Sequence, residues 1–181
     1  MKEKILPPLV LTIICALVCG LLVFAYNLTY VDTTGMITDK MKDALTEIYG
    51  TSDGYEMLKN DDGTVTAFDG VDSVIKGSDG TVAFEITSDG YSKGGLYMLV
   101  GMDTDGSIKG ISIMTIGETP GLGTKVQDKS FLDSFAGLSA ESDVDAVTNV
   151  TGATRSSNGM KRAAETAIRT YSEQKEVIFG E

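Results

Sequence analysis

The sequence predicts an α+β domain that follows an N-terminal apolar helix. Three patterns predict this organisation: an uncharged apolar run at 5–26, short β-rich runs separated by Asp-Gly pairs at 55–115, and an amphipathic helical pattern at 157–175. Asp-Gly pairs between alternating apolar runs are typical of hairpins, because glycine adopts the positive φ that tight turns need. The sheet is therefore predicted to be mostly antiparallel, with helices packed on it.

The apolar run at 5–26 is long enough to cross a membrane as a helix, since about 20 apolar residues span a hydrocarbon core of roughly 30 Å. Lys2 and Lys4 precede it, and by the positive-inside rule they hold the N-terminus in the cytoplasm. The sequence thus predicts a single-pass protein of the cell membrane. Residues 1–28 would form the cytoplasmic N-terminus and transmembrane helix, and 29–181 an extracytoplasmic domain.

A cleaved signal peptide is the alternative to a retained helix. Val23, Phe24 and Ala25 place small residues at the spacing that a signal peptidase reads. The apolar run is longer than the roughly 7–15 residues of a signal-peptide core, which favours retention.

The residue types of the chain exclude several kinds of site. The sequence has no histidine, and both cysteines, Cys15 and Cys19, lie in the apolar run. Serine–histidine and cysteine–histidine catalysis are therefore excluded, and no disulfide framework or cysteine-ligated iron–sulfur cluster is expected after the run. No catalytic residue and no metal site is predicted. The formal net charge of −11 disfavours binding to nucleic acid.

Helices are predicted on both sides of the β-rich region. Apolar residues at helical spacing indicate a helix over 34–49, which Gly50 would cap, and a second over 126–136. The runs expected to form strands are 64–68, 72–77, 81–87, 95–103 and 107–116. In the third predicted helix, over 157–175, one apolar stripe consists of Met160, Ala163, Ala164, Ala167, Ile168 and Tyr171.

A glycine-rich turn between a predicted strand and a predicted helix is the first candidate binding element. Residues 117–125 read GETPGLGTK. An ordinary turn explains Pro120 and Gly121, because proline fixes φ and glycine often follows it, but it does not explain the whole stretch. Three glycines around a proline would let backbone N–H groups approach a flat or anionic ligand, and Lys125 would add positive charge.

Small hydroxyl residues at a helix start form the second candidate element. Residues 148–160 read TNVTGATRSSNGM and lead into the third predicted helix, which is expected to begin near Ser156 or Ser157. A helix N-cap would explain one hydroxyl. The free N–H groups and dipole of a helix start also stabilise a phosphate, with Thr154 and both serines as hydroxyl neighbours and Arg155 as a cation.

Together, and behind an N-terminal apolar helix, the two elements resemble one family. This is the FMN-binding G subunit of the Rnf complex, the membrane-bound ferredoxin:NAD⁺ oxidoreductase, with its relative, the C subunit of the Na⁺-translocating NADH:quinone reductase. The family's [ST]-G-A-T element is matched by Thr151-Gly152-Ala153-Thr154. Its E-T-P-G-L-G element is matched by Glu118-Thr119-Pro120-Gly121-Leu122-Gly123. The resemblance includes the stretch GYSKGGLYMLVGMDTDGSIKGISI and covers roughly 90–171.

The resemblance implies one covalent FMN per chain, joined through its phosphate to Thr154 as a threonine phosphoester. The glycine-rich loop is expected to shape the surroundings of the flavin without carrying the bond. One position departs from the family: the flavin transferase usually meets an aspartate three residues before the [ST]-G-A-T element, where this chain has Thr148. The other residues implied in cofactor binding are Thr151, Gly152, Ala153, Arg155, Ser156, Ser157, Glu118, Thr119, Pro120, Gly121, Leu122, Gly123 and Lys125.

The function that the resemblance implies is electron transfer within a membrane-bound, ion-translocating ferredoxin:NAD⁺ oxidoreductase. The chain would relay electrons through FMN and would not be catalytically complete alone. Implied partners are other membrane subunits, including one with its own FMN, subunits with iron–sulfur clusters, and a flavin transferase. Two other functions stay open: an exported, membrane-anchored binding or sensory domain for an anionic ligand, and a pilin-like structural protein.

Overall fold

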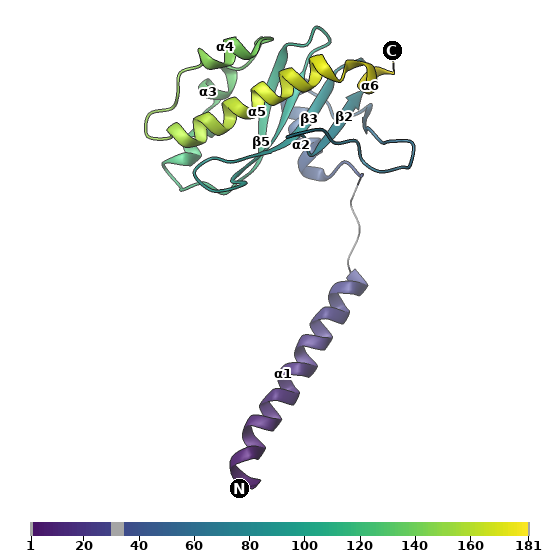
Figure 1. Cartoon of the computed structure of the whole chain (residues 1–181), viewed down its shortest axis with the longest axis vertical. Helices are drawn as coiled ribbons and strands as arrows, with labels where there is room; N and C mark the ends of the chain where they lie inside the picture. Colours follow the sequence, from purple (N-terminus) through teal and green to yellow (C-terminus); the bar gives the residue numbers. More distant parts are fainter. Residues whose placement is uncertain (1, 30–34, 181) are drawn as a thin grey trace. The chain divides into compact units, whose positions relative to one another are not determined.

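The protein is described here by a computed structural model, which covers residues 2–29 and 35–180. The described chain divides into two compact units, one within 1–33 and one within 34–181. The first unit holds a single helix, α1 (Lys2–Thr29), and the second holds every other element (Figure 1). Met1, residues 30–34 and Glu181, which belong to the predicted segments 1–28 and 29–181, lie outside the described residues.

Helix α1 forms where the apolar run predicts a helix, and its described large apolar side chains are exposed, as at Leu17 and Leu21. However, none of the helices in the described part of the chain combines the length and the apolar character needed to cross a membrane. The helix predicted for 5–26 is therefore confirmed, whereas its assignment as a transmembrane span is not.

Five antiparallel strands form one sheet whose strand order follows the chain. Strands that follow one another in the chain pair with one another, so the mostly antiparallel sheet that the hairpin signals predict is confirmed. The strands are β1 (Tyr55–Met57), β2 (Ser73–Gly77), β3 (Val82–Ser88), β4 (Leu96–Met102) and β5 (Ile108–Ile116).

The Asp-Gly turns behave as predicted at two hairpins, while one predicted strand is wrong. Gly80 and Gly106 have φ of 86° and 85° in the turns before β3 and β5. The run 64–68 forms only two isolated bridges, because it folds back on the segment after β1: the Thr66 N–H donates to the Leu58 carbonyl at 2.9 Å. This run therefore forms a loop beside the sheet.

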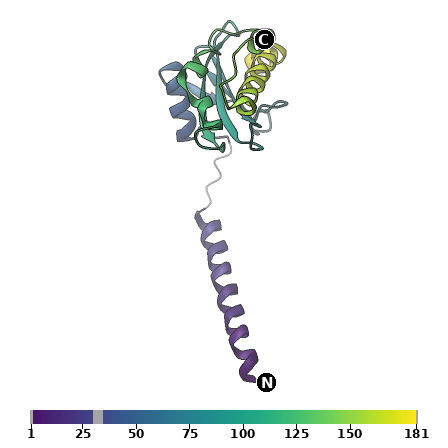
Figure 2. The same cartoon turned by 90° about the vertical axis from the view of Figure 1, so that its left-hand side faces the viewer.

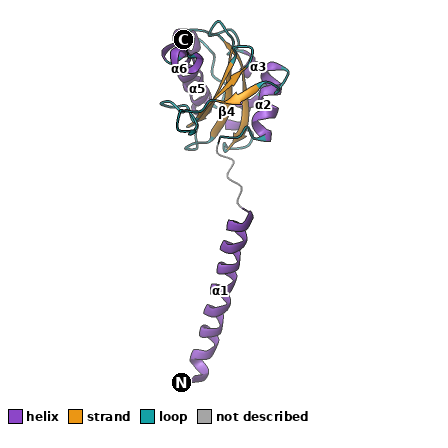
Figure 3. Cartoon of the chain, turned by 90° about the vertical axis from the view of Figure 1, so that its right-hand side faces the viewer, coloured by secondary structure: helices purple, strands orange, loops and turns teal. Residues whose placement is uncertain are grey.

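The sheet lies between two helices, α2 (Asp39–Tyr49) and α5 (Thr154–Glu173), as Figures 2 and 3 show. Because side chains alternate between the faces of a strand, each face supplies its own core. Phe84 and Met98 are buried in the core with α5, and Ala83 and Leu99 in the core with α2. The predicted stripe on α5 is confirmed, because all six of its residues are buried: Met160, Ala163, Ala164, Ala167, Ile168 and Tyr171.

The first predicted helix is shorter than its pattern indicates. α2 begins at Asp39, because Thr38 has extended backbone and its hydroxyl accepts a hydrogen bond from the Met41 N–H at 3.4 Å. Its C-cap is Gly50, with φ of 81°, as predicted. Thr34, the first residue of the predicted helix, lies outside the described residues.

The second predicted helix, over 126–136, is wrong as one element. It divides into a 3₁₀ helix, η1 (Gly123–Gln127), and the short α3 (Lys129–Asp133). Asp128 between them has ψ of 126°, an extended value that no helix continues through. Two further short helices, α4 (Glu141–Asp145) and α6 (Lys175–Phe179), follow without a sequence signal of their own.

Candidate functional site

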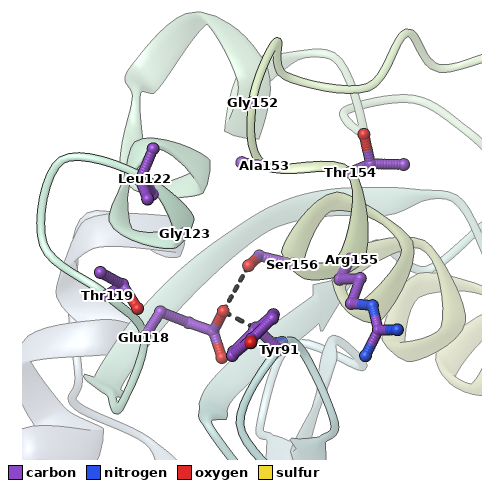
Figure 4. A pocket seen from close by; sticks show the side chains of 10 residues that line it. All are labelled: Tyr91, Glu118, Thr119, Leu122, Gly123, Gly152, Ala153, Thr154, Arg155 and Ser156. Carbon is purple, nitrogen blue, oxygen red and sulfur yellow. Dashed lines mark hydrogen bonds between the residues drawn. The ribbon is translucent and has the colours of Figure 1, made fainter.

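Three segments of the second unit surround a cavity of about 460 Å³ (Figure 4). They are the hairpin between β3 and β4, the turn between β5 and η1, and the first turn of α5. A cavity of roughly 300–1,000 Å³ is typical of a small-molecule site. The lining residues are Tyr91, Glu118, Thr119, Leu122, Gly123, Gly152, Ala153, Thr154, Arg155 and Ser156.

The two motifs singled out in the sequence meet at this cavity, although roughly thirty residues separate them along the chain. Most of the predicted site residues line it. The predicted residues that do not line it are Pro120, Gly121, Lys125, Thr151 and Ser157. The role of each of these residues in cofactor binding stays a prediction.

The first turn of α5 has no side-chain cap. Its N-cap residue is Ala153, and Gly152 before it has φ of 81°, a backbone conformation that favours glycine. The first N–H groups of a helix have no partner within the helix, and here no hydroxyl side chain satisfies them. The alternative that the small hydroxyl residues act as an N-cap is therefore wrong, and the positive end of α5 is open to an anion.

The hydroxyl groups of this turn have three different environments. The buried Ser156 hydroxyl donates to Glu118 Oε2. The buried Ser157 Oγ accepts the Val150 N–H at 3.0 Å. Thr154 is exposed, and its hydroxyl has no hydrogen-bond partner within the described part of the chain. Thr154 is thus the residue of this turn whose hydroxyl is free to react.

Glu118 joins the three walls of the cavity. Its Oε2 accepts the Tyr91 N–H at 3.1 Å as well as the Ser156 hydroxyl, and its Oε1 accepts the Ser92 N–H at 3.0 Å. The residue is only 6% exposed. Burial alone would raise the pKa of this carboxyl, but the Ser156 hydroxyl and the two backbone N–H groups outweigh it and hold the pKa below its usual value of 4.5.

Because these donors stabilise the ionised carboxylate, the stability of the domain should depend on the protonation of Glu118. A native pKa below the unfolded value adds stability above pH 4.5, and this stability is lost as the pH falls through the lowered native pKa. We expect the difference in unfolding free energy between wild type and Glu118→Gln to shrink from about pH 6.5 to about pH 3.5. Urea denaturation at both pH values measures this difference in unfolding free energy. A difference that does not change with pH would contradict a lowered pKa of Glu118.

Tyr91 is a wall of the cavity that sequence reasoning missed. Its side chain is 71% exposed, and the Arg155 guanidinium carbon lies 5.6 Å from the centre of its ring, within the range of a cation–π contact. A single exposed aromatic residue in a turn has no periodicity to mark it. Its place directly after Gly90, at the start of the glycine-rich stretch that resembles the family, was the available signal.

The glycine-rich turn owes its shape to local hydrogen bonds. Gly121 has φ of 73° and open space where a β-carbon would lie, so glycine is needed there for backbone conformation. Its N–H donates to Thr124 Oγ1 at 2.9 Å, and the Leu122 N–H donates to the Thr119 carbonyl at 3.1 Å. The exposed Lys125 lies farther along, in η1. The turn therefore presents Leu122, 52% exposed, at the cavity.

The segment that surrounds the cavity is similar to known proteins. Residues 90–169 match the family described as FMN-binding domain, and this range contains every residue that lines the cavity. The segment around the cavity is thus similar to an FMN-binding domain. The elements around its cavity suit FMN: the uncapped start of α5 and Arg155 suit the phosphate, and the exposed Tyr91 and Leu122 suit an apolar ring.

The chain is also similar to the G subunit of the ion-translocating oxidoreductase complex of Aliivibrio fischeri. It is 31% identical to the protein of strain MJ11 over 106 residues, which are 52% of this chain and 50% of that protein. It is 30% identical to the protein of strain ATCC 700601 / ES114 over 105 residues, 51% of this chain and 50% of that protein. The chain spans about half the length of the curated relatives it matches. The resemblance to the Rnf-type G subunit that the two motifs predict is thus confirmed.

Proposed function

We propose that the FMN-binding domain carries FMN esterified through its phosphate to Thr154 and relays electrons as one component of a multi-subunit, ion-translocating oxidoreductase. The observation that carries this proposal is the state of Thr154. It lines the cavity, it lies at the uncapped start of α5, and its hydroxyl has no partner within the described residues. The match to the FMN-binding domain supports the identity of the cofactor.

The chain's own groups have distinct tasks in this proposal. The Thr154 Oγ1 forms a bond to the phosphorus of the flavin donor and loses its proton, while a P–O bond of the donor breaks and the departing oxygen takes up a proton. The chain thereby gains the mass of FMN less one water. The N–H groups and dipole of α5 and the Arg155 side chain stabilise the phosphate charge. When bound, FMN supplies electron transfer, while the protein supplies position and electrostatics.

The names of the two relatives support a place in a larger complex. Ion translocation requires a membrane, so the complex is membrane-associated. The chain would exchange electrons with subunits that hold iron–sulfur clusters and with another membrane protein that has its own FMN. The sequence has no histidine and no cysteine after Cys19, so the ferredoxin:NAD⁺ chemistry would take place on those partners. A flavin transferase would form the ester.

Intact mass spectrometry of the full chain, produced with and without a flavin transferase, tests this proposal. We expect a mass increase of one FMN less one water only when the transferase is present, and a modified tryptic peptide that contains Thr154. An unmodified chain, or a flavin that is removed by denaturation, would contradict the covalent assignment. The second result would instead favour a domain that binds an anionic ligand reversibly at the uncapped start of α5.

Arg155 should raise the midpoint potential of the flavin, because it is the cation among the residues that line the cavity. A positive charge stabilises the reduced, more negative state of the ring. Since an exposed charge contributes up to about 1 kcal/mol, we expect Arg155→Gln to lower the potential by a few tens of millivolts, roughly. Redox titration of the visible absorption measures it. Arg169→Gln, on the same helix but outside the cavity, is the matched control and should leave the potential unchanged.

A further inference from the structure

Glu118 is a buried anion without a cationic partner. No lysine or arginine of the described residues forms an ion pair with it. Its two oxygens instead accept hydrogen bonds from two backbone N–H groups of the β3–β4 hairpin, at Tyr91 and Ser92, and from Ser156 on α5. A buried charge is costly unless it is hydrogen-bonded, so the arrangement of these two segments depends on this carboxylate.

Three glycines leave the space that the carboxylate occupies. A β-carbon at Gly90 or Gly95 in the hairpin would lie 2.6 or 2.5 Å from Glu118 Oε1. A β-carbon at Gly123, in the wall formed by η1, would lie 2.5 Å from Oε2. Such distances are too short for real contacts, so any side chain at these positions would displace the carboxylate. The absence of side chains at these glycines therefore lets the hairpin and η1 pack closely around Glu118.

We propose that Glu118 is the positioning residue of the cavity, which fixes Tyr91 and the β3–β4 hairpin relative to the start of α5. This inference rests on the proposed function, because the group so positioned is the wall against which the FMN ring is held. Both carboxylate oxygens face protein donors, so Glu118 acts through Tyr91 and Ser156. Glu118 holds the hairpin and the helix start together, while Arg155 contacts the ring of Tyr91 from α5.

Substitution by glutamine isolates this role. Each carboxylate oxygen accepts one backbone N–H of the hairpin, Tyr91 on Oε2 and Ser92 on Oε1. A glutamine side chain has one oxygen and one NH₂ group, so either orientation sets the NH₂ against a backbone N–H. Glu118→Gln must therefore lose one of the two hydrogen bonds that hold the hairpin, while it keeps the shape of the side chain.

The matched control is Glu85→Gln. Glu85 on β3 is 8% exposed and accepts hydrogen bonds from the Ser73 and Tyr97 hydroxyls, but it does not line the cavity. Both variants thus replace a buried, hydroxyl-bonded carboxylate by an amide of the same shape. A general loss of stability would affect them alike, whereas a loss of positioning would affect Glu118→Gln alone.

Two measurements on the full chain test the proposal. The first is visible circular dichroism of protein that carries FMN at Thr154, which reports how firmly the ring is held in an asymmetric site. We expect Glu118→Gln to lose most of this signal with the flavin still attached, and Glu85→Gln to keep it. The second needs no flavin: trypsin should cleave after the exposed Lys93 in the hairpin faster in Glu118→Gln than in wild type or Glu85→Gln.

The outcomes separate this inference from the proposed function. Wild-type protein without flavin at Thr154 would refute the proposed function, while the cleavage rate at Lys93 would still decide the role of Glu118. Unchanged cleavage and an unchanged flavin signal in Glu118→Gln would overturn the inference alone. If Glu118→Gln does not fold, Ser156→Ala decides: it removes one donor and should speed cleavage at Lys93, and an unchanged rate would overturn the inference.

Discussion

Replacement of Thr154 by alanine should abolish covalent flavin on this chain. The other two hydroxyl groups of the same helix turn are buried and engaged, Ser156 with Glu118 and Ser157 with the Val150 N–H. Neither can replace Thr154 without giving up a hydrogen bond in the interior, which costs about 1–3 kcal/mol. We therefore expect complete loss of flavin fluorescence from the denatured Thr154→Ala protein on a gel.

Two variants make this result specific. Thr151→Ala removes an exposed hydroxyl three residues earlier, outside the lining of the cavity, and should keep the fluorescence. Thr154→Ser restores a hydroxyl at the same position and should recover it at least in part. A fluorescent peptide that maps to Thr151 or Ser157 in the wild-type protein would place the ester elsewhere.

The largest effect on stability is expected at Gly159, in α5. A β-carbon there would lie 2.6 Å from the carbonyl oxygen of Asp89 and 2.6 Å from Leu96 Cδ1. The helix backbone is held at this distance by the Ser88 hydroxyl, which donates to the Gly159 carbonyl at 2.9 Å. A larger side chain must therefore push α5 away from the end of β3, where the hairpin of the cavity begins.

We expect Gly159→Val to lower the unfolding free energy by about 3 kcal/mol or more, the upper range for overpacking of a core. Urea denaturation measures this change. Ser172→Val is the control, because it places the same side chain at an exposed position of the same helix and should cost only about 0.5 kcal/mol through helix propensity. Equal stability of the two variants would mean that α5 does not approach β3 so closely.

Local signals in the sequence account for most of the fold. Asp-Gly pairs predict the hairpins at Gly80 and Gly106 because a tight turn is decided by neighbouring residues. The prediction of a strand at 64–68 is wrong because a strand needs a neighbouring strand to pair with. β1 already occupies that edge of the sheet, so this run forms only isolated bridges. The helix predicted over 126–136 fails because one residue, Asp128, has extended backbone inside an apolar helical pattern.

The site is predicted less completely, since its groups come from distant parts of the chain. The two motifs identify Thr154 and the turn near Glu118, but the sequence does not say which hydroxyl of the helix start stays free. That depends on Ser156 meeting Glu118, 38 residues away. Nor does the sequence reveal that Gly90 and Gly95 leave room for this carboxylate. The spacing of glycines does not indicate which side chain from a distant part of the chain lies beside them.

The order of the elements along the chain determines when, during synthesis and folding, the cavity can form. Each strand pairs with its neighbour in sequence, so the sheet can assemble hairpin by hairpin as the chain emerges. Until α5 docks, however, one face of that sheet is uncovered, and α5 begins with Thr154 itself. The acceptor hydroxyl and the walls around it thus come together only once α5 has been synthesised and has docked on the sheet. Attachment of a cofactor at Thr154 should therefore follow folding, and a chain cut short before α5 should expose an apolar sheet face and present no acceptor at all.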